Sequence, residues 1–291
     1  MVNKTQLKNQ FCDLTSTSTS TASRYLEASN YNLANAVDAY YDKHGNNNSK
    51  TNGKKSKSID PKLIKIYEKY KDPSNPEQID IDGTLNYLED LKIDPDDPKS
   101  LFLAFLLKSP KTGVFKRDEF LNIWQHYKIN SISQMKTFLN EFYEDILYNR
   151  GNYTSIEDNE GEEEILNFKK LYDFTFKFLI ESENQKVLNI ELAIEYWKLL
   201  LPLLIESYSV EQLDLNKSKI QERINQWFEF LKNYDSNKRK IITFDTWSMF
   251  YNFLIEILFN DPLNFKNYDE MASWPSKIDE YMEYLNDNNL I

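Results

Sequence analysis

Three segments of the chain have the length and spacing of a calcium-binding loop. An EF-hand loop places oxygen ligands at positions 1, 3, 5, 7, 9 and 12, with glycine at position 6 and a bidentate glutamate at position 12. KSPKTGVFKRDE begins at Lys108 and has Gly113 at position 6 and Glu119 at position 12. Positions 1 and 3 are Lys108 and Pro110, whose side chains cannot bind a cation. The spacing therefore predicts an EF-hand-like helix-loop-helix unit without metal.

The other two candidate loops lack more of the calcium pattern. DPSNPEQIDIDG, from Asp72, has glutamate at position 6 and Gly83 at position 12, and DSNKRKIITFDT, from Asp235, has Lys240 and Thr246 there. Both lose the turn glycine and the bidentate acid. We expect no metal and no other cofactor.

The nucleophiles and zinc ligands of common enzymes are scarce. The chain has one cysteine, Cys12, and two histidines, His44 and His126, whereas a zinc-RING needs about eight Cys and His ligands. One cysteine also excludes an internal disulfide, which fits a reducing compartment. We expect Cys12 to pack as a small apolar residue in a helix, and no Cys-His or Ser-His-Asp catalytic site.

Composition excludes several classes of partner. The formal net charge of -11 repels a phosphate backbone, so nucleic acid is not expected. No apolar run approaches the roughly 18 residues of a membrane span, and the polar start MVNKTQLKNQ lacks the apolar centre of a signal peptide. These features predict a cytoplasmic or nuclear protein, or one present in both compartments.

Periodicity and composition predict an all-α protein of two domains. Residues 44–58, HGNNNSKTNGKKSKS, have no aliphatic or aromatic side chain and are expected to form a flexible linker. Before it, residues 1–43 show helical patterns near 4–13, 21–28 and 33–43, with Ser20 or Thr21 and Asn32 as N-caps. This part is predicted to be a small three-helix bundle.

Residues 59–291 are predicted to form one larger helical domain. Apolar residues recur at i, i+3 or i+4 in roughly ten segments, from KLIKIYEKYK to SKIDEYMEYL. Two segments, 150–164 and 206–218, lack an apolar stripe and are expected to be surface loops.

Two groups of residues permit both a structural and a functional interpretation. The apolar cluster in SLFLAFLLKSPKTGVF, FTFKFL and YWKLLL is either plain core or the wall of a pocket. Asp245 can N-cap the helix that follows it, and Asp279 can be a solvated charge on the last helix, outside a buried face of Ile278, Tyr281, Met282 and Leu285. The residues alone thus predict a helical interaction protein.

Several aromatic motifs resemble one known family. YKDPSNPEQIDIDGTLNYLEDLKIDP, FKRDEFLNIW, LYDFTFKFLI, AIEYWKLLL, WFEFL, ITFDTW and YDEMASWPSKIDEY follow, in order and spacing, the potentiating-neddylation domain of the defective-in-cullin-neddylation family, over about residues 60–287. The first three helices are similar to the ubiquitin-associated domain of fungal members. The resemblance implies a non-covalent scaffold, not itself an enzyme, that orients a charged conjugating enzyme and a cullin for transfer of a ubiquitin-like modifier to a cullin lysine. A ubiquitin-receptor adaptor without ligase-stimulating activity is the alternative.

The resemblance also implies site residues. The pocket for the acetylated N-terminus of the conjugating enzyme falls on Leu103, Ala104, Leu107, Phe115, Phe178 and Leu199. The patch for the cullin's C-terminal winged-helix domain falls on Asp245, Ser273 and Asp279, with serine where the family has alanine. Contact with ubiquitin or the ubiquitin-like modifier falls on Leu14, Thr15, Ser16, Tyr40 and Tyr41, which depart from the usual Met-Gly-Phe/Tyr loop and leucine pair.

Overall fold

In a computed structural model, the chain divides into two compact units, residues 1–58 and 59–291. The structure describes residues 4–15, 19–29, 31–33, 35–36, 58–156, 164–180, 182, 184–208, 211–234 and 240–291. Nearly all of the predicted linker, 44–58, lies outside these residues, and the exact domain boundaries stay a prediction. The described residues are mostly α-helical, which confirms the predicted fold class.

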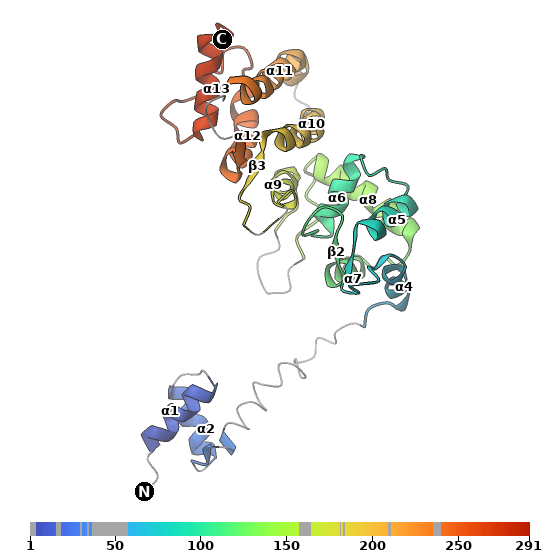
Figure 1. Ribbon diagram of the computed structural model, residues 1–291, viewed down its shortest axis with the longest axis vertical. Coiled ribbons are helices and arrows are strands. Elements are labelled where there is room, and N and C mark those ends of the chain that lie inside the picture. The colour runs from blue at the N-terminus through green and yellow to red at the C-terminus, as the bar shows by residue number, and fades with distance from the viewer. Residues whose placement is uncertain are drawn as a thin grey trace. The chain divides into compact units, whose positions relative to one another are not determined.

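The N-terminal unit begins with two helices, α1 (Lys4–Thr15) and α2 (Thr19–Ala28), drawn in blue in Figure 1. Helix α2 starts before the predicted caps Ser20 and Thr21, because every residue of the TSTSTS run is able to cap and the pattern cannot select one. Asn32 caps the next turn as predicted, since its side chain accepts from the Asn35 amide at 3.2 Å. Most of the predicted helix 33–43 lies outside the described residues.

A small apolar core holds these helices together. Its buried residues are Phe11, Ala22, Tyr25, Leu26 and Ala36. The rings of Phe11 and Tyr25 stack with their centroids 6.0 Å apart. Cys12 packs against this core from α1, as expected for a small apolar side chain.

The second unit contains the long helices of the chain. In the described part they are α4 (Pro61–Tyr70), α5 (Ile81–Leu91), α6 (Pro98–Leu106), α7 (Arg117–His126), α8 (Ile132–Leu147), α9 (Phe168–Phe178), α10 (Ile190–Ser207), α11 (Glu211–Glu229), α12 (Phe244–Phe253) and α13 (Ser276–Asp287). Two short π-helical stretches, η2 (Phe230–Tyr234) and η3 (Leu254–Leu258), extend α11 and α12. None of the described helices combines the length and the apolar character that crossing a membrane requires.

Most of these helices start at a polar side chain that accepts an orphan backbone N–H, which is why the chain turns helical there. The capping residues are Asp60, Asp80, Asp97, Ser131, Asn167, Asn189 and Thr243. The prediction of a loop over 206–218 is wrong, because α11 begins at Glu211. Strong helix formers such as Glu, Gln, Leu and Lys sustain its first turns without an apolar stripe. The described parts of 150–164 are not helical, as predicted.

Two short antiparallel ladders connect the loops that precede helices. Strand β1 (Gln78–Ile79) pairs with β2 (Phe115–Lys116), and β3 (Val187–Asn189) pairs with β4 (Ile241–Thr243). Each strand leads within two residues into a helix, namely α5, α7, α10 or α12. The ladders thus join helix-loop-helix units in pairs, and their likeness to EF-hands stays a prediction. The described residues contain no group of three or more His, Cys, Asp or Glu arranged to hold a metal.

One continuous apolar core runs through the second unit. Figure 1 shows helices α4 to α8 gathered on one side of α9 and helices α10 to α13 on the other. Helix α9 packs against α6, α8 and α12, so it joins the two groups. At the start of α5, a Cβ on Gly83 would lie 1.9 Å from the carbonyl oxygen of Tyr70, so only glycine lets α5 pack this closely on α4.

Candidate functional site

A mainly apolar cavity of about 400 Å³ lies between α5, α6, α9 and α10 and is called here the first cavity. Its lining is mainly apolar and includes Ile81, Leu85, Leu88, Leu101, Ala104, Phe115, Phe178, Tyr196 and Leu199. Two acids, Asp96 and Glu195, are its only charged lining residues in the described chain. The first cavity therefore fits a neutral apolar group, with negative charge at hand for a basic continuation.

The loop between α6 and β2 closes one side of the first cavity. Gly113 has a φ of +73°, and a Cβ there would lie 2.9 Å from the Ile81 side chain. Thr84 of α5 donates to the Gly113 carbonyl at 3.0 Å. Buried Ser109 places its hydroxyl 2.6 Å from the Val114 carbonyl oxygen. The loop that begins at Lys108 thus forms a wall of the first cavity, held by side-chain to backbone hydrogen bonds.

Four of the six predicted pocket residues line the first cavity: Ala104, Phe115, Phe178 and Leu199. The other two, Leu103 and Leu107, have exposed fractions of 0% and belong to the core beneath it. Periodicity along α6 cannot separate these two roles, because the helix is covered on more than one face.

The sequence argument missed Ile81 and Leu85, which stand at the rim of the first cavity. Their exposed fractions, 54% and 44%, are high for large apolar residues. They are four residues apart on α5, so they share one face of the helix with Leu88, which also lines the first cavity. An exposed apolar i, i+4 pair at the start of a helix was the available signal for a binding surface.

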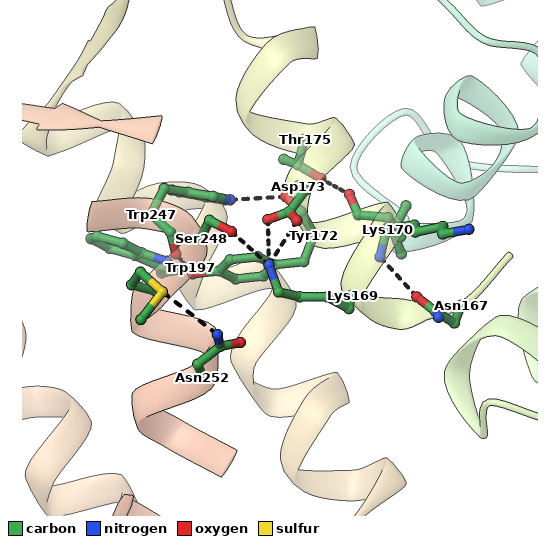
Figure 2. Close-up of polar contacts among 12 residues, drawn as sticks. Asn167, Lys169, Lys170, Tyr172, Asp173, Thr175, Trp197, Trp247, Ser248 and Asn252 are labelled. Atoms are coloured by element: carbon green, nitrogen blue, oxygen red, sulfur yellow. Dashed lines mark hydrogen bonds and ion pairs between the residues drawn. The ribbon is translucent and has the colours of Figure 1, made fainter. Parts of the chain in front are cut away.

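A buried aromatic junction joins α9, α10 and α12 (Figure 2). The Trp197 indole N–H donates to the Tyr172 hydroxyl at 2.6 Å, and that hydroxyl donates to the Trp247 carbonyl at 3.0 Å. The Trp247 indole N–H in turn donates to the Tyr172 carbonyl at 2.8 Å. Burial raises the pKa of Tyr172 well above its usual value, so the hydroxyl keeps its proton and the network stays intact.

A charged pair at the edge of the junction adds a second connection between α9 and α12. Lys169 donates to the Asp173 carboxylate at 2.7 Å and to the Ser248 hydroxyl at 2.7 Å (Figure 2). Phe178, in the first cavity, ends α9, and Asp245 lies in the first turn of α12. The junction therefore holds the two predicted sites on one rigid body.

The predicted cullin patch includes Asp279, in the first turn of α13. The Tyr268 hydroxyl donates to its Oδ1 at 2.6 Å, which fixes the direction of the carboxylate. Burial and the neighbouring Asp279 raise the pKa of Tyr268, so it remains a donor. Ile278, Tyr281, Met282 and Leu285 are buried beneath it, as the periodicity predicts. One oxygen of a half-buried, oriented carboxylate is left for a partner.

The other two patch residues, Asp245 and Ser273, are both exposed. The prediction that Asp245 caps α12 is wrong, because the Thr243 side chain accepts from the Thr246 amide at 3.1 Å instead. Thr243 occupies the N-cap position, where its hydroxyl reaches the unpaired amides of the first turn of α12. The Asp245 carboxylate is therefore not used as a cap and faces solvent. The ring of Tyr268, which donates to Asp279, contacts the ring of Phe253. Phe253 is eight residues after Asp245 on α12, which corresponds to roughly 12 Å along the helix at 1.5 Å per residue. The two acids are thus separate points on a broad surface.

A buried arginine positions the segment that leads to Asp279. Arg223 of α11 donates to the carbonyl oxygens of Pro262 at 2.9 Å, Leu263 at 3.2 Å and Leu290 at 2.9 Å. Its guanidinium lies 5.3 Å from the Phe265 ring centroid. Backbone carbonyls and a ring face thus compensate the buried charge, and they bind both flanks of α13 to α11.

Comparisons with known proteins agree with this arrangement. A family described as cullin binding matches residues 150–284, and a UBA-like domain matches residues 5–47. The chain is 50% identical to defective in cullin neddylation protein 1 of Candida albicans, over the full length of both. The chain belongs to the defective-in-cullin-neddylation family.

Other members of the defective-in-cullin-neddylation family are similar over most of the chain. The Yarrowia lipolytica protein of that name is 31% identical over 76% of each chain. The Cryptococcus neoformans protein is 30% identical over 96% of this chain and 92% of its own. The family match includes α9 to α13, the helices that carry Phe178, Leu199 and the acidic patch.

The family's ubiquitin-associated part is only partly described. Leu14 and Thr15 belong to α1, so this pair extends a helix where the resemblance implies a loop. Ser16, Tyr40 and Tyr41 lie outside the described residues, and their role stays a prediction.

Replacement of Arg223 tests its structural role. We expect Arg223→Met to lower the free energy of unfolding by about 3 kcal/mol, because three carbonyl groups lose a charged donor inside the protein. Urea unfolding of the full chain, followed by tryptophan fluorescence, measures this change, since all five tryptophans belong to the second unit. Gln221→Met, two residues earlier and exposed, serves as the matched control. Equal midpoints for the two variants would contradict the assigned role.

Proposed function

We propose that the protein is a non-covalent scaffold in cullin neddylation. It binds a cullin through the surface around Asp245, Ser273 and Asp279, and the acetylated N-terminus of the modifier's conjugating enzyme through the first cavity. The observation that carries the proposal is an apolar cavity with an acidic rim in a chain 50% identical, end to end, to a protein named for defective cullin neddylation.

The chemistry of the first cavity supports an acetylated N-terminus as its ligand. Acetylation removes the positive charge of an α-amino group, and burial of that charge among apolar side chains would be costly. The acids Asp96 and Glu195 attract a basic segment that follows the buried residue. Because the exposed pair Ile81 and Leu85 extends the apolar surface along α5, the ligand can continue as an amphipathic helix.

The charge of the C-terminal region supports a basic partner surface. Residues 267–287 contain six acids, Asp269, Glu270, Asp279, Glu280, Glu283 and Asp287, and one lysine. Charge-assisted hydrogen bonds to a prealigned carboxylate such as Asp279 are stronger than neutral ones. Serine at 273 is small enough to let a winged-helix domain approach as closely as alanine allows.

Rate acceleration then comes from geometry. Two partners held on one rigid body meet at a high effective concentration and in a restricted orientation. The amine of the cullin lysine attacks the thioester that joins the modifier to the conjugating enzyme; an amide bond forms, the carbon–sulfur bond breaks and the conjugating enzyme's thiol leaves. The scaffold itself therefore supplies no nucleophile. We place this activity in the cytoplasm, the nucleus or both.

The second candidate function is a ubiquitin receptor that does not stimulate transfer. The match of residues 5–47 to a UBA-like domain favours it. A reconstituted assay separates the two functions, with acetylated conjugating enzyme, modifier and a cullin C-terminal domain. We expect the protein to raise the initial rate of cullin modification at least tenfold, about 1.4 kcal/mol in the barrier. Equal rates with and without the protein would favour the receptor.

A charge placed in the first cavity should abolish peptide binding. We expect Leu199→Arg to weaken an acetylated N-terminal peptide of the conjugating enzyme at least tenfold in fluorescence polarisation, because the guanidinium fills apolar space. Leu203→Arg is the matched control, one turn later on α10, equally half-buried and outside the cavity lining. Similar losses in both variants would argue against the first cavity as the site.

Removal of the patch carboxylates should weaken the cullin complex. We expect Asp279→Ala to reduce affinity for the cullin C-terminal domain about tenfold, and the double variant with Asp245→Ala more, as charged contacts are lost. Glu283→Ala, exposed on the same helix, is the control and should change affinity little. Calorimetric titration gives the affinities, and wild-type affinity in the double variant would refute the assignment.

A further inference from the structure

A second cavity adjoins the first, and the proposed function does not use it. Its volume is about 380 Å³, and Ser109 and Phe178 line both cavities, so they form the dividing wall. The remaining lining is different, with Phe105 of α6, Ile123 of α7 and Phe174 of α9 among it. The two cavities are therefore separate compartments of one unit.

The outer side of the second cavity is formed by a strap, defined as residues 153–156 paired with 164–166. The Leu166 amide donates to the Tyr153 carbonyl at 2.8 Å, and the Ser155 amide donates to the Glu164 carbonyl at 2.8 Å. Lys108 donates to the Ile156 carbonyl at 2.5 Å, which attaches the strap to the loop after α6. These hydrogen bonds hold the strap in place as one wall of the second cavity.

The charge of the second cavity is opposite to that of the first. Lys108 and Lys177 are the charged residues in its described lining, and no Asp or Glu is present there, in a chain of net charge -11. Lys177 is exposed, lies 5.7 Å from the Phe244 ring centroid and forms no ion pair within the described structure. Lys108 is 3.9 Å from Glu119, an exposed pair that contributes little.

We propose that the second cavity binds a small amphipathic carboxylate, with an aliphatic or aromatic tail among the apolar side chains and the carboxylate between Lys108 and Lys177. At about 30 Å³ per heavy atom, the volume share of a water molecule, the cavity holds roughly twelve such atoms. Aromatic and aliphatic walls with a few charged groups at the rim are the usual features of a small-molecule site. The first cavity, with Asp96 and Glu195, repels the same ligand.

Decanoate, with twelve heavy atoms, tests the proposal on the full chain. We expect saturable one-to-one binding in calorimetric titration below the micelle concentration, and at least tenfold weaker binding of 1-decanol. Lys177→Glu should weaken decanoate at least tenfold, because attraction becomes repulsion. Lys198→Glu, an equal charge change at an exposed site on α10 outside both cavities, should not.

Isoleucine methyl NMR locates the ligand. Ile123 and Ile156 line the second cavity, whereas Ile81 lines the first. We expect decanoate to shift the methyl signals of Ile123 and Ile156 and to leave Ile81 unchanged. The proposal is overturned by absence of binding, by equal affinity for the alcohol, by an unchanged affinity in Lys177→Glu, or by shifts confined to Ile81.

Discussion

The arrangement of the second unit depends on one buried hydroxyl. The hydroxyl of Tyr172 accepts from the Trp197 indole N–H and donates to the Trp247 carbonyl, so three helices share a single polar group inside an apolar core. An unsatisfied partner there would cost about 1 to 3 kcal/mol, so the three helices can shift only together. The rings add geometry, since Trp197 and Trp247 stack at 5.0 Å with an interplanar angle of 12°. Such a junction suits a protein whose action is to hold partners in place.

Rigidity has a direct consequence for the binding surfaces. The first cavity and the acidic patch are both attached to the junction, the cavity through Phe178 on α9 and the patch through Asp245 on α12. A scaffold accelerates transfer only if it keeps its two partners at a fixed distance and orientation. Loosely attached partners would move relative to each other, and the advantage of holding them together would be lost. Ser109 and Phe178 form the wall between the two cavities, of which the first has acidic lining residues and the second has basic ones.

Much of this arrangement could be predicted from sequence, and the failures have physical causes. Amphipathic periodicity located the helices and the buried face of α13, because apolar spacing reports burial directly. Cap positions failed where several adjacent residues could accept the same amide, as with Ser20 and Asp245. The prediction of a loop over 206–218 failed because residues with high helix propensity form the start of α11 there without an apolar stripe. The cavity was predicted through four of its residues, while Leu103 and Leu107 proved to be core.

The sequence by itself determined the helical class, the absence of a calcium ligand set in the loop from Lys108 to Glu119, and the family, because residue type and local spacing suffice for each. Only the tertiary structure decided which apolar residues line a cavity and which fill the core. It also decided that Tyr268 aligns Asp279, that Arg223 binds both flanks of α13, and that two adjacent cavities differ in charge. These properties depend on contacts between residues far apart in the chain, which cannot be predicted from the local spacing of residue types.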